Sequence, residues 1–296
     1  MSSNFKRMDG FHRLESLWRI EYKATTMEPL LTRGVSDELR DEIGDLLGKT
    51  LPKPDLDAVP LIMGNKAVLT GNAVKGIFRH LLSAQLTQAG IKVCVQDVKV
   101  RPIETESKKQ SEDKVKEKVK EMGRLTQCPP DNPCFICTWF GTASRQGALY
   151  FSFLKSVKDL EEILAEEPIP MVALAEDTNA LIAVRGMGRF ALLAPLKENV
   201  EFRGWIKGEN LSEEIIGAIK EVQDMSEKGF VQFGGFKTRG FGALKIEILK
   251  IEKYETTPFK LGKSYEGDEL KSFLDECQRK YHALMDRGSK SCPSST

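Results

Sequence analysis

The order of strands and helices along the chain is the feature that most limits its fold. Residues 17–24, LWRIEYKA, alternate apolar and charged side chains, which predicts a strand with one buried face. Apolar residues at helical spacing predict a helix over 71–82. The remaining predicted elements are strands at 148–154, 200–206 and 243–251, a helix capped by Ser212, and a C-terminal helix over roughly 268–286.

Once insertions and the terminal helix are set aside, the order of the elements is β-α-β-β-α-β. This order is found in ferredoxin-like and RNA-recognition folds. We therefore predict an α+β, ferredoxin-like fold. Because many functions occur on this fold, it does not assign one by itself. The predicted strands lack the aromatic signature of RNA-recognition modules, so any RNA binding is expected to use loops.

Composition excludes some classes of protein. The net charge of the 296 residues is +1, which does not indicate a generally basic nucleic-acid binder, although a basic stripe balanced by acidic residues elsewhere remains compatible with it. No apolar run approaches the length of a membrane span, and the first residues lack the core of a signal peptide. We therefore expect a cytoplasmic protein without a membrane partner.

The chain is long enough for one large domain with several insertions. A run of 21 residues, ETESKKQSEDKVKEKVKEMGR, has almost no apolar side chain and cannot bury a face, so we assign it no function. The segment ALIAVRGMGRFALLAP predicts a hairpin with Gly186 and Gly188 at its tip. We expect a single domain over 1–290, insertions at about 28–70, 95–140 and 174–198, and a disordered tail over 288–296.

Three cysteines in the segment CPPDNPCFIC indicate a metal site. Cys128, Cys134 and Cys137 lie within ten residues, and thiols stay reduced in the cytoplasm, so they favour a structural zinc site over disulfides. Zinc requires a fourth ligand, for which Cys94 is the first choice and His80 the second. The alternatives are reduced cysteines without metal and a redox pair, although no thioredoxin-type context surrounds the C-x-x-C.

Two segments combine glycine with basic residues, as phosphate-binding sites do. In GNAVKGIFRHLL, Gly71, Asn72 and Lys75 stand at the start of a helix, where unpaired N–H groups attract anions. An ordinary N-cap at Asn72 is the other interpretation. In GGFKTRGFG, Lys237 and Arg239 stand among four glycines, which predicts either a phosphate cradle or a tight turn before a strand.

The segment KPDLDAVPLIM places two carboxylates, Asp55 and Asp57, on a loop that leads toward the predicted helix start. Loop carboxylates are usually only solvated. The three histidines are far apart in the sequence, and no nucleophile–His–acid pattern is present.

Taken together and in order, four segments resemble the backbone subunits of type III CRISPR effector complexes, which belong to the RAMP superfamily. The resemblance spans most of residues 14–253. The segments are VLTGNAVKGIFR, CFICTWFGTASRQGALYFS, VALAEDTNALIAVRGMGRFALLAPLKENVEFRGWIKG and FGGFKTRGFGALKI.

The resemblance implies a modified RNA-recognition fold that polymerises along a CRISPR RNA. It implies that 174–198 is a thumb hairpin, which wedges into the guide–target duplex, and that 28–70 is a catalytic-type loop. Asp57, or alternatively Asp55, would cleave target RNA with Mg²⁺ or another divalent metal. The implied partners are CRISPR RNA, target RNA, copies of the chain or related RAMP subunits, and the large and small subunits of the complex.

The resemblance also implies roles for the basic residues. Gly71, Asn72, Lys75 and Arg79 would hold a guide phosphate, Lys237 and Arg239 the backbone nearby, and Arg185, Met187 and Arg189 would form the thumb tip. One alternative is a non-catalytic scaffold with the same RNA contacts. Another is a stand-alone processing endonuclease, for which His12 is the one histidine near the first strand.

Overall fold

The structure is a computed structural model. It describes residues 13–32, 37–48, 56–94, 128, 132–142, 145–172, 183–184, 187–188 and 190–291. Asp55, Arg185, Gly186 and Arg189, and the whole charged run over 104–124, lie outside the described residues.

The centre of the molecule is an antiparallel sheet built around β1 (Ser16–Thr26). This strand lies between β10 (Glu201–Glu209) and β11 (Leu244–Thr256), and β4 (Leu149–Phe151) and β5 (Leu154–Ser156) pair with the other edge of β10. The full order is β12-β11-β1-β10-β5-β3-β2. Its inner part agrees with the strand arrangement of a ferredoxin-like fold, and the prediction of an α+β fold is confirmed.

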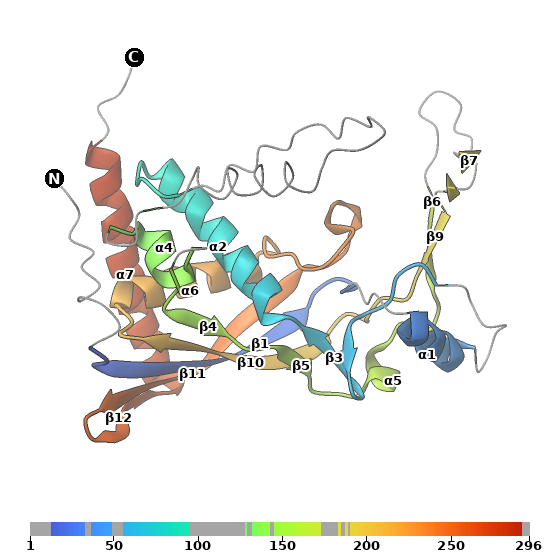
Figure 1. Ribbon diagram of the computed structural model, residues 1–296, viewed down its shortest axis with the longest axis horizontal. Helices are drawn as coiled ribbons and strands as arrows, with labels where there is room; N and C mark the ends of the chain where they lie inside the picture. Colours follow the sequence, from blue (N-terminus) through green and yellow to red (C-terminus); the bar gives the residue numbers. More distant parts are fainter. Residues whose placement is uncertain are drawn as a thin grey trace, which may run out of the picture.

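Helices cover one face of this sheet (Figure 1). They are α2 (Gly71–Gln88), α4 (Phe135–Phe140), α6 (Glu213–Glu227) and α7 (Gly267–Ser291). On β1 every second residue is buried, among them Trp18, Ile20 and Tyr22, whereas the residues between them are partly exposed. This alternation places the hydrophobic core between β1 and the helices, as a period of two requires.

Several elements extend the sheet beyond the predicted core. The hairpin of β2 (Ile62–Met63) and β3 (Lys66–Leu69) forms one edge, and β12 (Phe259–Tyr265) the other. The acidic helix α1 (Asp37–Leu47) and the short α5 (Leu160–Ile163) lie near the β2–β3 end (Figure 1). Helix α7 continues to Ser291, so the expected tail from 288 is wrong for its first residues, which still belong to the helix.

A two-stranded ribbon, β6 (Ile169–Val172) with β9 (Phe190–Leu193), leaves the main sheet (Figure 1). Farther along, β7 (Ala183–Val184) pairs with β8 (Met187–Gly188). A small second core lies near β9 and joins segments that are distant in the sequence. Its buried members are Leu31, Ala58, Leu193 and Phe241.

Among the helices that the structure describes, none combines the length and the apolar character needed to cross a membrane.

Candidate functional site

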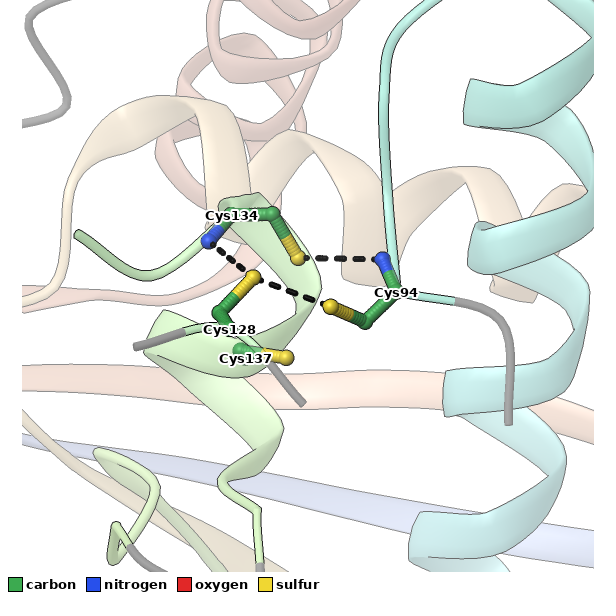
Figure 2. A group of neighbouring side chains, drawn as sticks. All are labelled: Cys94, Cys128, Cys134 and Cys137. Carbon is green, nitrogen blue, oxygen red and sulfur yellow. Dashed lines mark hydrogen bonds between the residues drawn. The ribbon is translucent and has the colours of Figure 1, made fainter. Parts of the chain in front are cut away.

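Four cysteines meet between the end of α2 and the start of α4 (Figure 2). Their sulfur atoms all lie within 4.8 Å of one another. The Sγ atoms of Cys94 and Cys128 are 2.9 Å apart, which is too far for a disulfide. A tetrahedron of sulfurs around zinc has edges of about 3.8 Å, since each Zn–S bond is about 2.3 Å long. The four cysteines could therefore bind a metal such as zinc.

The local fold explains why these thiols meet. Cys134 is the N-cap residue of α4 and Cys137 lies one turn later, so both sulfurs occupy the start of the same helix. Cys94 arrives from the loop after α2, and its N–H donates to Cys134 Sγ at 3.4 Å. Cys128 Sγ accepts from the N–H of Cys134 at 3.2 Å. His80, the second choice for the fourth ligand, is exposed on α2 and does not belong to the cluster.

Three of these thiols differ in pKa. Hydrogen bonding from Cys137 lowers the pKa of Cys134 to about 5. Burial and the hydrogen bond with Cys94 raise the pKa of Cys128 to about 11, and hydrogen bonding to Cys134 raises the pKa of Cys137. Cys134 is therefore the thiol that loses its proton more readily than Cys128 and Cys137. A bound cation would remove the cost of ionising the others.

The start of α2 differs from the predicted cap. Thr70 is the N-cap, and its Oγ1 accepts from the N–H of Ala73 at 3.3 Å, so the interpretation of Asn72 as the cap is wrong. Gly71 is buried, and a Cβ there would lie 2.2 Å from the carbonyl oxygen of Phe151. Gly71 thus allows the helix to approach β4 closely. Asn72 is exposed beside the first amides of the helix.

Two cations follow on α2. Lys75 and Arg79 are both half-buried and one helical turn apart, and no carboxylate of the described residues forms an ion pair with either. Burial and then the charge of Arg79 lower the pKa of Lys75. Arg79 donates to the carbonyl oxygen of Gly141 at 3.0 Å, which holds its guanidinium in place. Like charges in this spacing repel each other, and an anion between them would relieve the repulsion.

The glycine-rich loop before β11 presents both of its basic residues to solvent. Lys237 and Arg239 lie in a 3₁₀ turn, η1 (Lys237–Arg239), and are exposed. Phe236 precedes the turn in the left-handed conformation at φ 57°, and the Arg239 guanidinium lies 5.8 Å from the centre of its ring. The N–H of Gly235 donates to the carbonyl oxygen of Leu31 at 3.0 Å. These contacts hold the turn against the segment that follows β1.

Asp57 lies at the base of the β6–β9 ribbon. Its N–H donates to the carbonyl oxygen of Leu192 at 2.9 Å, and its Oδ2 accepts from the N–H of Leu192 at 2.7 Å. Its neighbour Ala58 is buried in the second core with Phe241, which also contacts Phe236. Asp57, the ribbon and the loop of Lys237 and Arg239 are therefore joined through one small core.

The structure brings some predicted site residues together and leaves others apart. The second core joins Asp57 to the glycine-rich loop, whereas α2 begins against β4, through the contact of Gly71 with Phe151. Met187 belongs to β8. The cap at Thr70 was not predicted, although a Thr directly before a helix is a usual cap signal. The hydrogen bond between Asp57 and Leu192 was not predicted either, because no local sequence pattern signals it.

A ferredoxin-like sheet with a glycine-rich loop, a basic helix start and a cysteine cluster resembles RNA-associated proteins. A shared fold does not by itself assign a function. Comparison with known proteins is more specific: a family model described as the RAMP superfamily matches residues 23–245. No curated protein matches the chain. The chain belongs to the RAMP superfamily, and this membership implies a CRISPR-associated, RNA-binding subunit.

The cap assignment can be tested by a matched pair of substitutions. Thr70→Ala should lower the free energy of unfolding by about 1 kcal/mol, because it leaves the Ala73 N–H without its side-chain acceptor. Asn72→Ala should change it by less than about 0.5 kcal/mol, since the side chain is exposed. Urea unfolding followed by circular dichroism gives both values. An equal or larger loss for Asn72→Ala would contradict the assignment.

Proposed function

We propose that the chain is a backbone subunit of a type III CRISPR effector complex. It binds CRISPR RNA and target RNA, and it assembles with copies of itself or related RAMP subunits and with the large and small subunits. The observation that carries this proposal is the start of α2, where Lys75 and Arg79 lie side by side without a described carboxylate partner. Membership of the RAMP superfamily makes RNA the expected polyanion.

The proposed guide contacts are independent of sequence. Asn72 and the first amides of α2 would receive a phosphate, and Lys75 and Arg79 would neutralise it. Lys237 and Arg239 would contact the backbone at the glycine-rich loop, where both are exposed. Contacts of this kind position RNA without reading its bases, as a subunit that carries many different guides requires.

The β6–β9 ribbon is the proposed thumb, with Arg185, Met187 and Arg189 toward its tip. Asp57 at its base is the proposed cleavage residue, and Asp55 is the alternative. Asp57 is exposed and uses Oδ2 to hold the ribbon, so Oδ1 is available to a hydrated Mg²⁺, which commonly uses only one or two protein carboxylates. The metal would stabilise charge at the phosphate, while the ribbon would hold the target strand in a kinked conformation.

A non-catalytic scaffold is the second candidate function. The bond between Asp57 Oδ2 and the Leu192 N–H favours it, because this contact gives the carboxylate a structural role without any chemistry.

The guide contacts can be tested by salt dependence. Replacing Lys75, Lys237 and Arg239 with Ala should weaken binding of several unrelated guide RNAs by similar factors. The slope of log K against log salt should fall by about 0.7 for each lost phosphate contact. Lys271→Ala, at an exposed position of α7, is the control and should leave the slope unchanged. An unchanged slope in the triple variant would contradict the proposed contacts.

Cleavage can be separated from structure with two substitutions at Asp57. Asp57→Asn removes the charge but keeps an oxygen that can accept from Leu192, whereas Asp57→Ala removes both. In assembled complexes, the Asp57→Asn variant should reduce Mg²⁺-dependent target cutting by on the order of 100-fold or more and leave target binding intact. The Asp57→Ala variant should show the same loss of cutting and should also loosen the ribbon, because the hydrogen bond to Leu192 is lost. Asp55→Ala tests the alternative residue.

Two outcomes of this experiment are decisive. If cutting persists in the Asp57 and Asp55 variants, the activity lies elsewhere. If the wild-type complex binds its target without cutting it, the scaffold is the correct function.

The cysteine cluster is proposed to hold structural Zn²⁺ through Cys94, Cys128, Cys134 and Cys137. Protein purified without chelator should contain about one zinc per chain, and a strong chelator should lower its unfolding temperature, because the metal ties α4 to the end of α2. Cys134→Ser should lose the metal. Cys277→Ser, at a buried cysteine outside the cluster, should retain it. If wild-type protein purified without chelator contains no zinc, and chelator does not change its unfolding temperature, the zinc site is excluded.

A further inference from the structure

The face of the sheet opposite the helices carries aromatic and basic side chains together. On β10, Phe202 and Ile206 are buried toward the helices, so Arg203, Trp205 and Lys207 lie on the other face. The cross-strand register continues this face onto the neighbouring strands. Tyr150 of β4 is opposite Lys207, and Lys155 of β5 is opposite Arg203.

The charges on this face are not evenly compensated. The cations that β1 places on this face are paired, Arg19 with Glu21 and Lys23 with Glu247. Arg203 pairs with Glu201. Two further cations lie on the β10 and β5 part of this face. Lys155 and Lys207 form no ion pair with any described residue. The Lys207 ammonium lies 4.3 Å from the centre of the Trp205 ring. The β4–β5 side of the face therefore keeps positive charge next to an aromatic ring.

Two aromatic side chains there are accessible. Trp18 and Trp139 are buried at 5% and 7% exposure, whereas Trp205 is partly exposed and is therefore the most accessible of the three tryptophans. Phe153 is 46% exposed, a high value for a phenylalanine that immediately precedes a strand of the main sheet. Ser152, the residue before Phe153, is held against the backbone of Trp205, because its N–H donates to the carbonyl oxygen of Trp205 and its Oγ accepts from the backbone N–H of Trp205.

This surface adjoins the start of α2. A Cβ on Gly71 would touch the carbonyl oxygens of Phe151 and Ser152, so the first turn of the helix lies directly against the backbone that leads to Phe153. Lys155 is also opposite Val68 of β3, the strand that runs into the helix. An RNA strand held at the start of α2 thus has a short path onto the open face of β10.

We propose that Phe153, Lys155, Trp205 and Lys207 form a binding surface for single-stranded RNA. Bases stack on Trp205 and Phe153, and the two lysines contact the adjacent phosphates. Proteins bind single-stranded nucleic acid with aromatic rings that stack on the bases and with cations that contact the phosphates. Such stacking tolerates any base. This proposal rests on the proposed function, because both take RNA as the ligand. It adds a binding surface on the sheet that is separate from the contacts proposed for the start of α2 and the glycine-rich loop.

The position of Trp205 allows a direct test with the full chain. Addition of a single-stranded oligouridine to the wild-type protein should quench tryptophan emission, and high salt should reverse the quenching. Trp205→Leu should weaken binding about tenfold or more, measured by anisotropy of a labelled oligonucleotide, because base stacking is lost. Trp205→Phe should bind within a few-fold of wild type but show no quenching, since the remaining tryptophans are buried.

Matched variants separate this site from the loop contacts. Lys155→Ala and Lys207→Ala should each weaken binding, whereas Lys250→Ala, which removes a lysine that is paired with Glu252 and Glu266, should not. Unfolding temperatures equal to wild type for Trp205→Phe and the lysine variants establish that folding is intact.

The outcomes are distinguishable. If Trp205→Leu and Trp205→Phe bind as wild type does and emission stays constant while Lys75→Ala loses binding, this proposal is overturned and the proposed function stands. If the wild-type chain and its assembled complex bind no RNA, the proposed function itself fails. Emission that changes with protein concentration alone, together with a dimer mass, would show that a second copy covers this face and would also overturn the proposal.

Discussion

The antiparallel pairing of β1 with both β10 and β11 is the constraint on which the rest of the structure depends. Ile20, for example, is opposite Ile206 on one side and Ile251 on the other, and all three are buried. A shift of the register by one residue would move every buried side chain of β1 to the opposite face. The pairing therefore decides which face receives the helices and which face leaves Trp205 and its neighbouring lysines accessible.

The candidate site depends on a second, smaller core. Leu31 follows β1, Ala58 precedes the β2–β3 hairpin, Leu193 ends β9 of the ribbon, and Phe241 lies near the end of the glycine-rich loop. Burial removes these apolar side chains from water, and it therefore holds together four segments that are far apart in the sequence. Asp57 is anchored to Leu192 as a result, and the loop of charged residues before β11 is stabilised beside it.

The cysteine cluster shows how far sequence reasoning reached. The C-x-x-C of Cys134 and Cys137 was visible in the sequence because its spacing is local, and the structure places both cysteines at the start of one short helix. Cys94 was the first choice for the fourth position, and the structure brings it to 2.9 Å from Cys128. His80 could not be excluded from sequence alone, because its direction depends on how α2 packs. The rotation of α2 points His80 to solvent.

The sequence by itself determined the α+β order of elements, the main strands and helices, and membership of the RAMP superfamily, because these depend on local periodicity and short motifs. The tertiary structure alone decided that Thr70 caps α2, that Gly71 serves close packing, and that Asp57 bonds to the ribbon. It also placed Trp205 on the face of the sheet opposite the helices. The sequence had predicted strands without an aromatic signature, so RNA contacts were expected on loops alone. A periodic pattern records that one face is buried, but the residues that meet across space depend on how the elements pack.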